Sequence, residues 1–135
     1  MGKLINELRY EHRMIYQLLS SLRDLDGGPE DIRKLLLAAR QRIMEHLRKE
    51  DTLLYPALSK AAGRDKILYE KLDKLEAEMA VTTARLDRFF NKYSKSGTLD
   101  NFIGDLNSIY SLVKDRLQKE ELYLFTEYAA CSNKE

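Results

Sequence analysis

The chain has 135 residues, of which 33% are charged and 44% are hydrophobic, and its formal net charge is +1. This length suits one domain, and this composition excludes a disordered chain. Acidic and basic residues are interleaved, so we expect neither a nucleic acid nor a membrane surface among its partners. The sequence shows no signal-peptide core and no apolar run of transmembrane length, which predicts a cytoplasmic protein.

Helix-forming residues dominate, and turn residues are confined to a few breaks in the chain. The first helix is predicted at about residues 3–25 and ends at the Asp-Gly-Gly-Pro sequence of residues 26–29. The second is predicted at about residues 29–62, because Pro29 suits a first helical position. Pro56 lies inside it and cannot donate a helical hydrogen bond, so we expect a kink or a local break just before Pro56.

Two further helices are predicted in the second half of the chain. The third covers about residues 65–93 and ends at the Ser-Lys-Ser-Gly sequence of residues 94–97. The fourth covers about residues 98–130, with Thr98 as its N-cap. Short connections make successive helices antiparallel neighbours. Residues 1–135 therefore predict one all-α domain, an antiparallel up-down-up-down four-helix bundle.

Steps of three and four residues trace the inner stripe of each helix. Five polar or charged residues interrupt these otherwise apolar stripes: His12, His46, Glu50, Arg116 and Glu120. Antiparallel packing can bring them to one level, and buried charges are costly unless they are paired, hydrogen-bonded or bound to a metal. A lone inner histidine is more often a hydrogen-bonded core residue than a ligand. His46 and Glu50, however, are four residues apart and project from one face, as two ligands of one ion do.

Two stretches of the sequence are versions of one segment. They are HLRKEDTLLYP at residues 46–56 and RLQKEELYLF at residues 116–125. Together with Glu11 and His12 in a leucine-rich first helix, they resemble the hemerythrin-like (HHE cation-binding) family over nearly the whole chain. The resemblance implies a four-helix bundle that holds one or two non-haem irons with histidines and carboxylates.

The ligands that the resemblance implies by position are His12, His46, Glu50, and Glu120 or Glu121. Arg116 stands where the fourth helix of the family carries a histidine. Met79 and Thr83 stand where the third helix carries one or two more. Three imidazoles are thus missing, which argues against a full di-iron site and against a normal oxygen carrier.

Two interpretations of these residues remain open. In the first, two imidazoles and two carboxylates form a reduced metal site that suits ferrous iron, and also zinc or manganese. Such a site would sense or handle iron, oxygen or nitric oxide. In the second, no metal binds, because the permanent charge of Arg116 pairs with Glu50 and Glu120 and replaces it. The bundle would then act as a regulatory or protein-interaction module.

The sequence contains no readable pair of nucleophile and base, and no glycine-rich phosphate loop. We therefore do not expect an enzyme. The expected partners are a metal ion, a small gas ligand or another protein.

Overall fold

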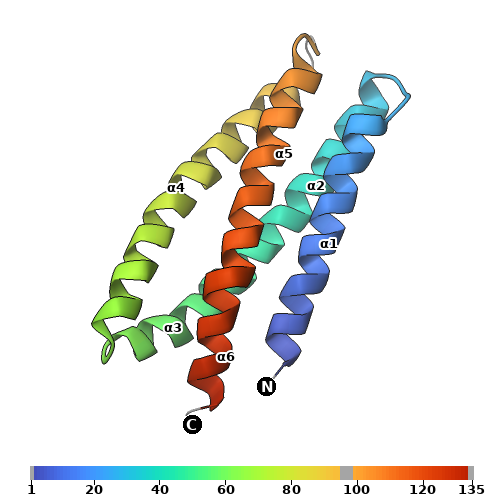
Figure 1. Cartoon of the computed structure of the whole chain (residues 1–135). Helices are drawn as coiled ribbons and strands as arrows, with labels where there is room; N and C mark the ends of the chain where they lie inside the picture. The colour runs from blue at the N-terminus through green and yellow to red at the C-terminus, as the bar shows by residue number, and fades with distance from the viewer. Residues whose placement is uncertain (1, 95–98, 134–135) are drawn as a thin grey trace.

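Four helical rods form an antiparallel bundle in the computed structural model, which describes residues 2–94 and 99–133 (Figure 1). The first rod covers residues 3–24 and the third covers residues 66–94. The second rod (residues 29–62) and the fourth rod (residues 102–133) each consist of an α-helix, a π-helical segment and a second α-helix. In chain order the elements are α1 (Lys3–Asp24), α2 (Pro29–Lys49), the π-helical η1 (Glu50–Leu54), α3 (Tyr55–Ala62), α4 (Lys66–Ser94), α5 (Phe102–Lys119), the π-helical η2 (Glu120–Leu124) and α6 (Phe125–Asn133). The predicted all-α four-helix bundle is confirmed, and the described residues contain no strand.

The second rod begins and bends as local sequence chemistry predicts. Gly28 is extended and Pro29 occupies the first helical turn, with two acidic residues at the positive end of the helix dipole. The disturbance expected before Pro56 takes the form of η1, after which α3 leaves the direction of α2 (Figure 1). At the next turn the Asp65 side chain accepts the backbone N–H of Ile67 and of Leu68, both at 3.1 Å, and so caps α4.

The fourth rod begins at Phe102 rather than at residue 98, and it continues to Asn133 rather than ending near residue 130. Asn101 is the reason for the late start, because its φ of 63° is left-handed and cannot belong to a right-handed helix. The N-cap predicted at Thr98 lies outside the described residues.

The core consists of two apolar clusters with a polar layer between them. The first cluster includes Ile15, Leu19, Leu36, Phe90, Leu106 and Val113, and the second includes Leu8, Leu54, Leu58, Leu72, Leu124 and Phe125. In α1, His12 follows Leu8 of the second cluster and precedes Ile15 of the first. The second and fourth rods also pass from the first cluster to the second, from Ile43 to Leu54 and from Val113 to Leu124, with the buried polar residues in between. The buried polar side chains therefore share one level of the bundle.

Among the described residues, no helix is both long enough and apolar enough to span a membrane.

Candidate metal centre

Two buried carboxylates each open a π-helical segment. Glu50 is the first residue of η1 and Glu120 is the first residue of η2. The backbone carbonyl of each accepts the N–H five residues later, from Tyr55 and from Phe125 respectively. π-turns within α-helices are rare and are frequent at functional sites. Here they mark the level of the polar layer in the second and fourth rods.

The two histidines of the chain meet at this level. His12 Nε2 and His46 Nε2 lie 3.1 Å apart, and each side chain is almost fully buried. The His12 ring stacks on Phe125, with the ring centroids 5.3 Å apart. Both Nε2 atoms therefore point into one small volume, which is the arrangement that two imidazole ligands of one ion require.

Glu120 joins the two imidazoles. His12 Nε2–H donates to Glu120 Oε1 at 2.9 Å, and His46 Nε2 lies 3.3 Å from the same oxygen. Burial alone would raise the pKa of Glu120, but the hydrogen bonds from His12 and His46 outweigh burial and hold the pKa well below its usual range. Glu120 is therefore an anion, and its Oε1 faces both rings.

Glu50 is the buried carboxylate that lacks a hydrogen-bond partner among the described residues. Its Oε2 lies 3.4 Å from His46 Nε2. Within the described part of the chain, neither oxygen of Glu50 accepts a hydrogen bond, although the side chain is fully buried. Burial and the neighbouring charge of Glu120 raise the pKa of Glu50 well above its usual value. An unpartnered buried carboxylate is costly, and a bound cation would offset that cost.

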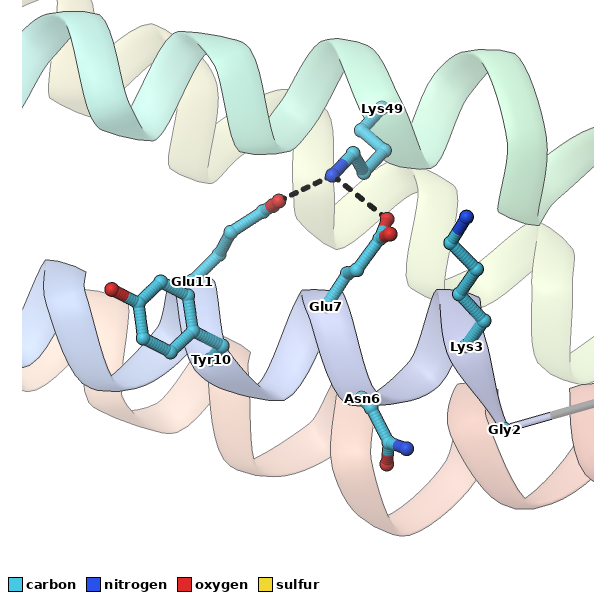
Figure 2. A pocket seen from close by; sticks show the side chains of 7 residues that line it. All are labelled: Gly2, Lys3, Asn6, Glu7, Tyr10, Glu11 and Lys49. Carbon is cyan, nitrogen blue, oxygen red and sulfur yellow. Dashed lines mark hydrogen bonds and ion pairs between the residues drawn. The ribbon is translucent and has the colours of Figure 1, made fainter.

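His46 is held from outside the cluster by Glu11. His46 Nδ1–H donates to Glu11 Oε1 at 2.8 Å, so Nε2 is left to face the cluster. Lys49 Nζ donates to Glu11 Oε2 at 2.6 Å and to Glu7 Oε2 at 3.2 Å. Figure 2 shows Lys49 reaching from the second rod towards both α1 carboxylates at the wall of an open surface pocket.

The protonation of His46 reflects this surrounding of carboxylates. Burial alone would lower the pKa of His46, but Glu11, Glu120 and Glu50 outweigh burial and raise the pKa to about 11. The position between these carboxylates therefore strongly favours a positive charge, which either a proton or a metal ion can supply.

Arg116 points into the core and is only 4% exposed. Its Nε donates to Glu120 Oε2 at 3.1 Å, its Nη1 donates to the Leu75 carbonyl at 3.1 Å, and its Nη2 donates to the Tyr55 hydroxyl. The predicted pairing with Glu120 is present. The predicted pairing with Glu50 is absent from the described contacts, and the guanidinium contacts Oε2 of Glu120 while the imidazoles contact Oε1.

Glu121 does not join the cluster. Its side chain is partly exposed, and its Oε1 lies 3.8 Å from His12 Nδ1 and 3.9 Å from Arg9 Nε. Between the two adjacent acids, Glu120 is therefore the one that faces the imidazoles. The third predicted rod, α4, contributes the backbone carbonyl of Leu75, and Met79 makes no described polar contact with the cluster.

Some contributors were not singled out from the sequence as parts of this site. Glu11 was noted only as the neighbour of His12, yet it binds His46 across two helices. Tyr55 belongs to the 46–56 segment, and its hydroxyl accepts a hydrogen bond from Arg116. The π-turn in the fourth rod was not expected, since no proline follows it. The repeat of the 46–56 segment at residues 116–125 is the signal that would have predicted it.

The four residues that converge fit a metal ion. His12, His46, Glu50 and Glu120 each offer one ligand atom, and these atoms all lie within 4.8 Å of one another. Two imidazole nitrogens and two carboxylate oxygens suit a divalent transition metal. The structural reason to expect a cation here is that neither oxygen of Glu50 has a hydrogen-bond partner among the described residues, and a bound cation would satisfy both.

An all-α bundle with a buried cluster of histidines and carboxylates defines a class of cation-binding four-helix proteins. The family model described as the Hemerythrin HHE cation binding domain matches residues 3–128. The chain therefore belongs to the hemerythrin HHE cation-binding family. Comparisons with curated proteins and with solved structures give no match.

Proposed function

We propose that this bundle binds non-haem ferrous iron through His12, His46, Glu50 and Glu120, and uses it to sense or handle iron, oxygen or nitric oxide. The convergence of four ligand atoms within 4.8 Å supports this function most directly. The set of two histidines and carboxylates is one that ferrous iron accepts, and iron held there would supply a redox-active centre with an open position for a small gas molecule.

Each residue has a separate task in this function. His12 and His46 offer Nε2, while Glu11 fixes the orientation of the His46 ring by accepting from Nδ1. Glu50 and Glu120 supply negative charge in a buried environment where a cation is strongly favoured. The surrounding apolar clusters exclude bulk water from this layer. We propose binding and sensing rather than enzymatic turnover, and not the normal oxygen carriage of a di-iron site.

Anaerobic loading with ferrous iron tests the proposal. We expect near-stoichiometric iron by elemental analysis and a matching titration by calorimetry. His46→Ala should abolish binding, because it removes the imidazole at the centre of the cluster. Glu50→Gln should weaken binding, whereas the exposed Glu45→Gln on the same helix should leave it unchanged. A folded wild-type protein that binds no iron in either measurement would refute the proposed function.

A metal-free regulatory or protein-interaction module is the second candidate. The observation that favours it is the buried guanidinium of Arg116, which already neutralises Glu120. The visible spectrum of protein purified from iron-rich cells separates the two candidates. A coloured protein supports the iron site, and a colourless one without metal by elemental analysis supports the module.

A further inference from the structure

Glu120 is shared between two positions that each favour a cation. Its Oε1 faces His12 Nε2 at 2.9 Å and His46 Nε2 at 3.3 Å. Its Oε2 accepts from Arg116 Nε at 3.1 Å. The two oxygens of one carboxylate point to different sides, so the polar layer has an imidazole side and a guanidinium side.

The two sides come from matching pieces of backbone. His46 and Glu50 are four residues apart in the second rod, and Arg116 and Glu120 are four residues apart in the fourth. Each acid opens a π-helical segment. Arg116 therefore occupies, in its rod, the place that His46 occupies in the other. An imidazole can give a lone pair to a metal, whereas a guanidinium is always protonated and has only donors.

The guanidinium is fixed where it lies. Its three described partners come from three different elements: Glu120 in η2, the Leu75 carbonyl in α4 and the Tyr55 hydroxyl in α3. Arg116 is only 4% exposed, so moving it to solvent would break all three of these contacts. Arg116 is thus a permanent part of the layer rather than a side chain that leaves when a ligand enters.

We infer that Arg116 is a built-in cation that fills the guanidinium side of the layer, so that the cluster takes one divalent ion, on the imidazole side. This inference rests on the proposed function and deepens it by assigning the number of ions. With neutral imidazoles, the two buried acids and Arg116 leave one net negative charge, which a single divalent ion more than balances. A second ion would have to bind beside two existing cations in a buried site.

Arg116 also limits how tightly that ion binds. Arg116 donates to Oε2 of Glu120, while Oε1 of the same carboxylate faces the position of the ion. The positive charges of the guanidinium and the ion would therefore be close together and would repel each other. Arg116→Gln removes this charge and keeps a side-chain amide that can donate to Glu120. Repulsion between a unit charge and a divalent ion at this range outweighs the loss of the two hydrogen bonds to Leu75 and Tyr55, which are made whether or not the ion is bound. We expect the variant to bind the ion at least tenfold more tightly.

The experiment is a calorimetric titration with ferrous iron under anaerobic conditions, repeated with zinc, and paired with elemental analysis. It compares the wild type, Arg116→Gln and the control Arg48→Gln, an exposed arginine on α2. Circular dichroism checks that each protein is folded. We expect one ion in the wild type and the control with equal affinity, and at least tenfold tighter binding in Arg116→Gln.

The outcomes separate this inference from the proposed function. Two ions in the wild type, or equal affinity in the wild type and Arg116→Gln, would overturn the role of Arg116 and leave metal binding intact. No ion in the wild type but one in Arg116→Gln would overturn both the proposed function and the stoichiometry of one ion, and would leave Arg116 as the charge that excludes the ion. No ion in either folded protein would overturn both. If Arg116→Gln does not fold, the wild-type stoichiometry decides, since one ion supports the inference and two overturn it.

Discussion

The two halves of the buried polar layer share a backbone but differ in electrostatics. In both halves, a glutamate is the first residue of a π-helical segment, and a histidine or an arginine lies four residues before it. In the fourth rod, Glu120 receives hydrogen bonds from a guanidinium and an imidazole, and its pKa is lowered. In the second rod, Glu50 receives none among the described contacts, and its pKa is raised. The same π-helical turn thus begins with a hydrogen-bonded acid, Glu120, in the fourth rod and with an acid that lacks hydrogen-bond partners among the described residues, Glu50, in the second.

The residue four positions before each acid therefore decides whether that acid already has a positively charged hydrogen-bond partner. His46 leaves its acid free to bind an ion, whereas Arg116 supplies the positive charge itself. The half with the histidine therefore holds the acid that a cation would satisfy, whereas in the other half Arg116 already gives Glu120 a positively charged partner. Four predictions test this contrast, each on metal-free protein unless stated.

The largest effect is expected for Arg116→Ala. Removing one partner of a buried ion pair leaves the other charge uncompensated, so the free energy of unfolding should fall by about 3–5 kcal/mol. Urea denaturation followed by circular dichroism measures it. The exposed Arg48→Ala should change the stability by less than about 0.5 kcal/mol. A neutral result for Arg116→Ala would show that the guanidinium does not neutralise Glu120 in solution.

The same substitution in the two halves should have opposite signs. At pH 7, Glu50→Gln should raise the free energy of unfolding by about 1–3 kcal/mol, because burial raises the pKa of the Glu50 carboxyl and keeping this acid in the core costs stability at that pH, whereas a neutral amide does not ionise. Glu120→Gln should lower it by about 2–3 kcal/mol, because charge-assisted hydrogen bonds are lost. Paired denaturation curves provide the measurement. Equal signs for the two variants would remove the contrast between the halves.

The outer support of His46 should matter for metal affinity. Glu11→Gln replaces the carboxylate that holds His46 Nδ1–H, and losses of this kind typically reduce metal affinity about 10–100-fold. Calorimetry with ferrous iron measures the change in the dissociation constant. Glu7→Gln is the matched control, because Glu7 binds Lys49 but makes no described contact with His46. An affinity in Glu11→Gln equal to that of the control would mean that the ring needs no such support.

The smallest effect is expected at the hydroxyl that binds Arg116. Tyr55→Phe removes one acceptor of the guanidinium and keeps the ring in the second apolar cluster, so stability should fall by about 1 kcal/mol. Tyr123→Phe, on a half-exposed side chain, should be neutral. Thermal and urea denaturation give the comparison. Identical midpoints for both variants would show that this hydroxyl is not needed to hold Arg116.

Much of the fold follows from the sequence because its signals are local. Helical periodicity placed His12, His46, Glu50, Arg116 and Glu120 on inner stripes, and these side chains do lie together. The break at Gly28 and Pro29 follows from the backbone chemistry of those residues. The break before Pro56 lies where it was predicted, but proline alone does not explain it, because η2 has the same form without a proline. The start of the fourth rod at Phe102 was missed, because nothing in the sequence specified a left-handed Asn101.

Local sequence patterns were enough to predict a four-helix bundle that resembles the hemerythrin HHE cation-binding family, with histidines and acids on the inner stripes of its helices. Only the tertiary structure decided that Glu120 rather than Glu121 faces the imidazoles, that Arg116 points inward, and that Glu11 holds His46. The reason is that periodicity fixes which face of one helix a residue occupies. Which oxygen meets which nitrogen depends on the relative height and rotation of several helices, and those are set by packing across the whole core.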